Sequence, residues 1–136
     1  MTKRQIKKYL KKNYKTRKKH NNSHDLIIRT RDCECHIKIM RTSSNTQVTI
    51  NSKEIWEFKR GRVNGLRFKE YSKTLHDIGN FMELENNIII LTNKPYRIYK
   101  YVNESEVIDV SNELIVYNTS LISNLSDIKS IINEKS

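Results

Sequence analysis

The sequence predicts one α/β (or α+β) domain of three layers, in which a central mixed sheet is flanked by helices. The chain has 136 residues, a length that fits one domain and leaves no room for two. Apolar side chains recur at helical spacing near both ends of the chain. Between them, residues 88–91 form a continuous apolar run, which is typical of a strand buried on both faces.

The first half of the chain alternates helical and extended patterns. Near-helical spacing of Ile6, Tyr9 and Leu10 predicts a helix, and the residues after it predict a β-hairpin followed by a third short strand. Asn51 and Glu54 have the spacing of a capping box, which predicts a short helix. The expected elements are a helix over residues 3–18, strands over 25–29, 34–41 and 47–50, and a helix over 51–61.

The second half begins with the clearest amphipathic pattern in the sequence. Apolar positions between residues 68 and 82 step alternately by three and four, as they do on one face of a helix. Short β-prone segments follow, and helical spacing returns near the C-terminus. The expected elements are a helix over 68–83, strands over 88–91, 97–102, 106–110 and 114–117, and a last helix through Ile128, Ile131 and Ile132.

Basic residues are concentrated at the N-terminus. The formal net charge is +11; residues 1–20 hold ten Lys and Arg and no acid, while the other 116 residues hold 16 basic and 15 acidic residues. The sequence therefore predicts a basic helical arm over residues 1–20 and a single, nearly neutral domain over 21–136. Such an arm favours nucleic acid, because neutralised phosphates release condensed counterions. The predicted contact residues are Lys3, Arg4, Lys7, Lys8, Lys11, Lys12, Lys15, Arg17, Lys18 and Lys19.

A second cationic cluster consists of Arg60, Arg62, Arg67 and Lys69. A glycine among these cations, Gly61, suits a loop that contacts phosphates. Solvated surface residues are the alternative for both cationic groups. An anionic membrane surface is disfavoured as a partner, because the N-terminal helix has no large aromatic anchor.

Composition also excludes other classes of protein. No apolar stretch approaches the ~20 residues of a membrane span, and the N-terminus has no apolar run for a signal peptide, so we expect a cytoplasmic protein without a membrane partner. Cys33 and Cys35 are too few for a secreted disulfide framework. His20 and His24 would complete a zinc ligand set with them, but structural zinc sites prefer C-x2-C spacing. We expect no metal and no bound cofactor.

The order of elements, together with one spacing, carries a family resemblance. Asp25 opens a strand, and thirteen residues later Lys38 lies in the next strand, within a hydrophobe-Lys-x-Met segment. Trp56, a helix and the apolar strand at 88–91 follow. Across residues 22–132, this order resembles the nuclease-related domain (NERD) branch of the PD-(D/E)XK fold. The resemblance implies a restriction-endonuclease-like domain, whose motif Asp, Glu and Lys serve a metal-dependent nuclease.

Matched residue by residue, the family's motif is altered in this chain. Asp25 takes the aspartate position, Lys38 the glutamate position and Met40 the lysine position. A cation repels Mg²⁺ and a thioether does not activate water, so this match implies a lost hydrolytic site. In an alternative register, Glu34 and His36 share a strand face with Lys38. The catalytic set would then be Asp25, Glu34 and Lys38, acting with Mg²⁺.

These observations leave three functional hypotheses. The first is a nucleic-acid-binding protein on a nuclease-like scaffold without hydrolytic activity, with DNA favoured over RNA. The second is an active, Mg²⁺-dependent nuclease. The third is a small protein of a phage or other mobile element, which binds and inhibits a nucleic-acid-processing machine and so has a protein partner.

Overall fold

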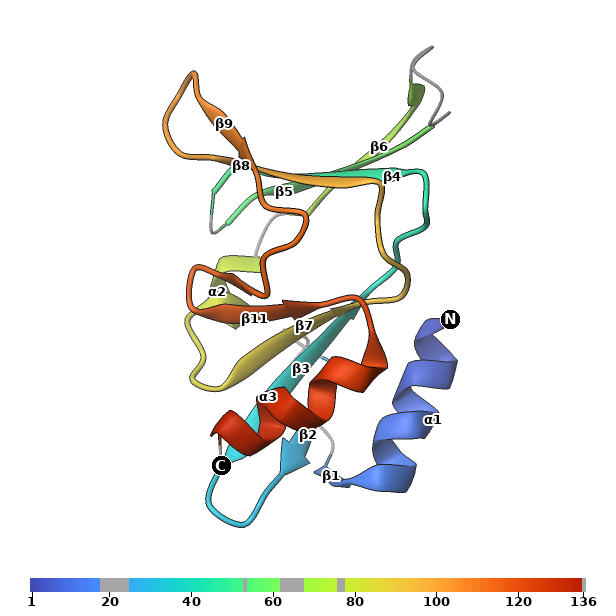
Figure 1. Cartoon of the computed structure of the whole chain (residues 1–136), viewed down its shortest axis with the longest axis vertical. Helices are drawn as coiled ribbons and strands as arrows, with labels where there is room; N and C mark the ends of the chain where they lie inside the picture. Colours follow the sequence, from blue (N-terminus) through green and yellow to red (C-terminus); the bar gives the residue numbers. More distant parts are fainter. Residues whose placement is uncertain (18–24, 53, 62–67, 76–77, 136) are drawn as a thin grey trace.

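The computed structural model describes residues 1–17, 25–52, 54–61, 68–75 and 78–135. These residues form an α+β domain with two mixed β-sheets and three α-helices (Figure 1). The elements are α1 (Lys3–Asn13), β1 (Lys15–Arg17), β2 (Leu26–Arg29), β3 (Glu34–Met40), β4 (Thr46–Ile50), β5 (Trp56–Gly61), β6 (Phe68–Leu75), α2 (Ile78–Met82), β7 (Asn87–Leu91), β8 (Arg97–Tyr101), β9 (Val107–Asp109), β10 (Ile115–Val116), β11 (Thr119–Ile122), the 3-10 helix η1 (Leu125–Asp127) and α3 (Ile128–Lys135).

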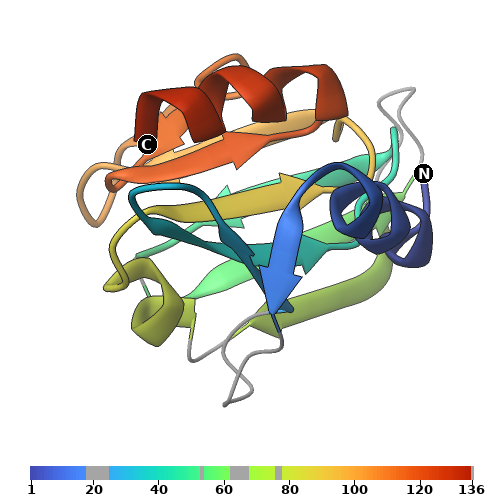
Figure 2. The same cartoon turned by 90° about the horizontal axis from the view of Figure 1, so that it is seen from below.

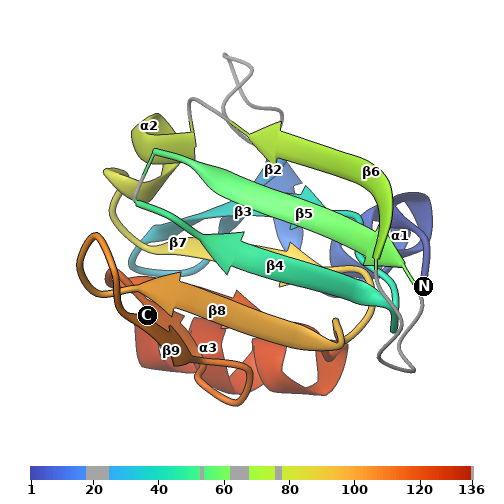
Figure 3. The ribbon, with the colours of Figure 1, turned by 90° about the horizontal axis from the view of Figure 1, so that it is seen from above.

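The two sheets stack face to face, and α1 and α3 cover the outer face of one of them. The six-stranded sheet has the order β1-β2-β3-β7-β11-β10, and the five-stranded sheet has the order β6-β5-β4-β8-β9 (Figure 3). Figure 2 shows α1 in blue and α3 in red beside the six-stranded sheet. The α+β class agrees with the prediction. The prediction that helices flank the central sheet on both sides is wrong, because the second outer layer is a sheet.

Two apolar clusters hold the layers together. One lies between the sheets and contains Trp56, the largest fully buried side chain. The other lies between the six-stranded sheet and the helices α1 and α3. β7 contributes Ile88 and Ile90 to the helix side, and Ile89 and Leu91 to the side of the second sheet. The predicted burial of this strand on both faces is therefore confirmed.

β5 replaces the helix predicted over residues 51–61. Trp56 and Phe58 are buried, whereas Glu57 and Lys59 are partly exposed, and this alternation belongs to a strand that faces one core. The amide of Asn51 donates to the Ile55 carbonyl at 3.0 Å, which closes a turn before the strand. The capping-box spacing marks this turn and not a helix.

The helix predicted over residues 68–83 is also wrong. Most of that segment is β6, which pairs antiparallel with β5 and places Leu75 opposite Trp56. Only α2 is helical. The strand gains its backbone hydrogen bonds from β5, the strand that precedes it, and this pairing overrides the helical spacing of the apolar residues.

The end of the first helix and one additional strand also differ from the prediction. The first helix ends at Asn13, because Tyr14 has extended backbone angles and the chain then enters β1. Near the C-terminus, Tyr117 and Asn118 both have positive φ and form the two-residue turn of a hairpin. This turn adds β11, which the sequence did not predict because Thr119 and Ser120 are polar. Within the described part of the chain, none of the helices has the length and apolar character needed to cross a bilayer.

Candidate nucleic-acid interface

α1 is firmly attached to the body of the domain. Thr2 Oγ1 accepts a hydrogen bond from the Gln5 amide (3.1 Å), and Gln5 Oε1 accepts one from the Thr2 amide (2.8 Å), which completes a capping box. Ile6 and Leu10 are 1% and 0% exposed and lie in the helix-side core. The predicted basic arm is thus a packed helix up to Asn13, and its orientation on the sheet is fixed.

The outer face of α1 is cationic. Its exposed basic residues lie within an arc of about 100° on the side away from the core, given 3.6 residues per turn. No acidic residue occurs before Asp25. We call this surface the α1 basic face; its residues are Arg4, Lys8, Lys11 and Lys12.

Two other lysines of α1 have a different role. Lys3 Nζ lies 2.8 Å from Asp25 Oδ1, and Lys7 Nζ lies 3.7 Å from the same oxygen. Asp25 Oδ2 accepts a hydrogen bond from the Ile39 amide at 2.7 Å. Burial on its own raises the pKa of Asp25, but the Lys3 ammonium, the Ile39 amide and Lys7 together outweigh it and lower that pKa. Asp25 therefore ties α1 to β3.

Replacing Asp25 with Asn is expected to lower the free energy of unfolding at pH 7 by about 1–2 kcal/mol, because both lysines are partly solvated. Since the folded-state pKa is lowered, the stabilisation is complete above the unfolded value of about 3.9 and disappears as the pH falls through the folded value. Urea denaturation of Asp25→Asn and wild type between neutral and acidic pH measures this. A stability difference that grew on acidification would contradict the assignment.

The residues of the predicted catalytic set are held by different partners. Glu34, His36 and Lys38 alternate with buried residues along β3, so they share one face, as the alternative register predicts. Glu34 Oε2 accepts a hydrogen bond from Arg17 Nε at 2.5 Å, and this hydrogen bond lowers the pKa of Glu34. Asp25 is bound to α1 instead. Among the described residues, no three His, Cys, Asp or Glu side chains are grouped to hold a metal ion.

A second group of cations lies at the edge of the six-stranded sheet. Lys15 on β1 lies directly opposite Arg29 on β2, and both side chains are exposed. Arg31, also exposed, follows in the turn before β3. Like charges that face each other across two strands are unfavourable, and Glu34, which lies opposite Arg29 on β3, offsets part of this repulsion. We call Lys15, Arg29 and Arg31 the β1–β2 edge cations.

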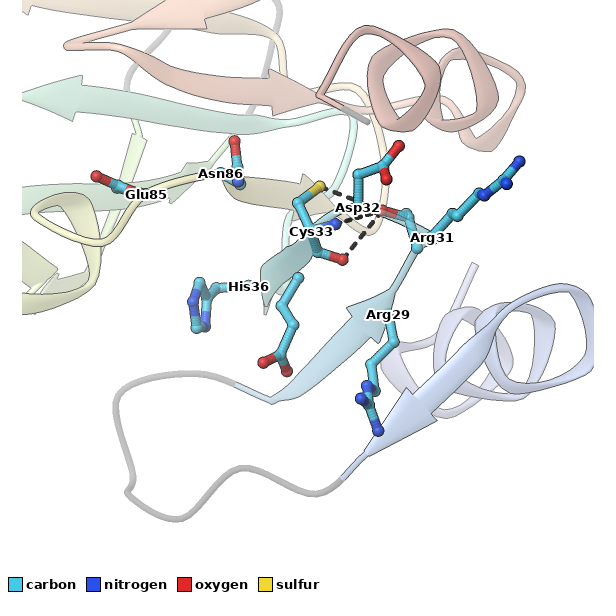
Figure 4. A pocket seen from close by; sticks show the side chains of 9 residues that line it. Arg29, Arg31, Asp32, Cys33, His36, Glu85 and Asn86 are labelled. Atoms are coloured by element: carbon cyan, nitrogen blue, oxygen red, sulfur yellow. Dashed lines mark hydrogen bonds between the residues drawn. The ribbon is translucent and has the colours of Figure 1, made fainter.

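An open hollow of about 510 Å³ adjoins this edge. Figure 4 shows Arg29 and Arg31 on one side of it, and Glu85 and Asn86 on the other. Burial lowers the pKa of His36, which lines the hollow, so the imidazole is neutral at pH 7. The lining residues are Arg29, Thr30, Arg31, Asp32, Cys33, Glu34, His36, Glu85 and Asn86.

Sequence reasoning did not single out Arg29, Arg31, Glu85 or Asn86. Arg29 and Arg31 stand two apart around a predicted hairpin turn, which was the available signal. Glu85 and Asn86 come from the turn before β7, and no sequence spacing relates them to the β2–β3 turn. The amide of His36 donates to the Asn86 carbonyl at 2.9 Å, a contact that depends on the parallel pairing of β3 and β7.

For several predicted site residues, the structure does not describe the side chain. Lys18, Lys19, Arg62 and Arg67 lie outside the described residues, as do the two histidines of the zinc alternative, His20 and His24. Arg60 lies in β5 and Lys69 in β6. Of the zinc alternative's cysteines, Cys35 is completely buried in the helix-side core and Cys33 packs against it.

The comparisons with known proteins add no family to this description. No family model matches the chain, and no curated protein or solved structure matches it significantly. The resemblance to the nuclease-related domain therefore stays a prediction.

Proposed function

We propose that this protein binds nucleic acid, duplex DNA above all, through the α1 basic face and the β1–β2 edge cations, without hydrolysing it. The observation that carries the proposal is the division of the cations on α1. Lys3 and Lys7 lie beside Asp25 and hold the helix, whereas the four residues of the α1 basic face are exposed. The buried Ile6 and Leu10 keep these four side chains on one surface.

A fixed helix supports binding better than a frayed tail would. Its backbone is already ordered, so less conformational entropy is lost when the lysines contact phosphates. Lysine and arginine contacts to phosphate position a protein on DNA but carry no sequence information directly. We therefore expect binding that depends strongly on salt and weakly on base sequence.

The predicted outcome of a combined binding and cleavage assay is a retarded but intact duplex. A labelled DNA duplex incubated with the full chain and Mg²⁺ should shift on a native gel and run unchanged on a denaturing gel. The reason is that both carboxylates already pair with cations of the chain, Asp25 with Lys3 and Glu34 with Arg17. Neither carboxylate is therefore positioned as a metal ligand. A single-stranded RNA of equal length should shift at higher protein concentration.

If the duplex were cut, two variants would show whether the predicted catalytic residues are responsible. If the wild type cut the duplex in Mg²⁺ and both Asp25→Asn and Glu34→Gln abolished the cut, the nuclease hypothesis would replace the proposed one. If the duplex were neither shifted nor cut at low salt, the proposal would fail altogether.

A further inference from the structure

In contrast to the basic helix α1, the segment from the end of β8 to η1 is acidic. Residues 101–128 contain five acidic residues and no Lys or Arg, in a chain whose net charge is +11. The acids that belong to the β8–β9 hairpin and the following turn are all exposed: Glu104, Glu106, Asp109 and Glu113.

The same segment carries most of the exposed large apolar side chains found among the described residues. Val107 and Ile108 of β9 are 41% and 42% exposed, and Leu114 before β10 and Ile115 within it are 51% and 65% exposed. Exposed apolar side chains on an edge strand favour association with another polypeptide.

β9 is also the last strand of the five-stranded sheet. The Val102 amide donates to the Glu106 carbonyl, and the Val110 amide donates to the Ile98 carbonyl. In an antiparallel ladder hydrogen-bonded residues alternate, so the polar backbone groups of Ile108 face β8. Those of Val107 and Asp109 face outward, where a further strand could pair with them.

We propose that β9 is a docking edge for an extended segment of another polypeptide, one in which Lys or Arg alternate with apolar residues. The outward backbone groups of Val107 and Asp109 would pair with that segment as an added strand. The exposed apolar residues would contact its apolar side chains, and the hairpin acids would attract its cations. This edge is separate from the α1 basic face, so the inference does not depend on nucleic-acid binding.

The charge pattern argues for a foreign segment and against a second copy of β9. Two copies of this hairpin would bring acids against acids, which is unfavourable. A basic segment instead neutralises these acids, of which only Asp109 has an ion-pair partner among the described residues, Arg97 at 3.7 Å.

The test uses the full chain and an end-blocked synthetic peptide of alternating Lys and Val, titrated by calorimetry. We expect the wild type to bind the peptide and Val107→Pro to bind it about tenfold or more weakly. Proline removes the outward N–H of residue 107 and leaves the hydrogen bonds between β9 and β8 in place. Glu104→Gln with Glu106→Gln should weaken peptide binding severalfold. Lys8→Gln with Lys12→Gln should leave it unchanged, and a peptide of alternating Glu and Val should not bind.

Three results would overturn the inference. The first is no binding of the Lys–Val peptide. The second is equal binding to wild type and to a Val107→Pro variant that melts like wild type, since purely electrostatic attraction would survive that change. The third is concentration-dependent dimerisation of the wild type that Val107→Pro abolishes, which would assign the edge to a second copy of this chain.

Discussion

Replacing the four residues of the α1 basic face with glutamine is expected to weaken binding of duplex DNA about a thousandfold at about 0.1 M salt. Each phosphate contact contributes about 0.9 to the log–log dependence of affinity on salt, so four contacts account for a factor of this order. Glutamine keeps a helix propensity close to that of lysine, and these side chains lie away from the buried Ile6 and Leu10. Fluorescence anisotropy with a labelled duplex measures the loss.

A matched pair of double variants separates the α1 basic face from net charge. Lys8→Gln with Lys12→Gln and Arg97→Gln with Lys100→Gln each remove two cations, but the second pair lies on β8 in the opposite outer layer. We expect the first pair to weaken binding by about 60-fold at about 0.1 M salt and the second by no more than about threefold. Equal losses would mean that DNA responds only to the total charge of the protein.

Trp56→Ala is expected to lower the free energy of unfolding by about 3–5 kcal/mol. The Trp56 side chain is 0% exposed and belongs to the core between the two sheets, so its removal leaves a large cavity. Urea denaturation measures the change. A loss below about 1 kcal/mol, as for a surface position, would contradict the assignment of this segment to a buried strand.

Trp56→Phe provides the control for that variant. The indole Nε1 of Trp56 is buried, and no acceptor for it is found among the described residues. Phenylalanine keeps an aromatic ring in the core and removes the buried indole N–H. We expect this substitution to cost less than about 2 kcal/mol, clearly less than the alanine substitution.

The sequence predicted elements well where local pattern and tertiary context agree. The hairpin of β2 and β3, the buried strand β7 and the last helix all follow from period-two or continuous apolar runs, or from helical spacing. The predictions over 51–61 and 68–83 were wrong because β5 and β6 pair with each other as consecutive antiparallel strands, which the spacing of apolar residues within either segment does not show. The second sheet depends on that pairing, so helical layers on both sides of a central sheet were predicted in its place.

The candidate site was predictable in charge and not in arrangement. The run of lysines identified α1, and the 3.6-residue period already separates Lys8 from Ile6. That Lys3 and Lys7 lie beside Asp25 depends on how α1 crosses the sheet, which no sequence spacing specifies. The hollow near His36 likewise joins two turns, 30–33 and 85–86, that are more than fifty residues apart.

The slope of log affinity against log salt concentration tests the central claim most directly. For wild type and a DNA duplex, contacts from the α1 basic face together with two of the β1–β2 edge cations give a slope of about −5, and the variant lacking the α1 basic face should have a slope of about −2. A wild-type slope near zero, or the same slope for both proteins, would show that these cations do not contact phosphates.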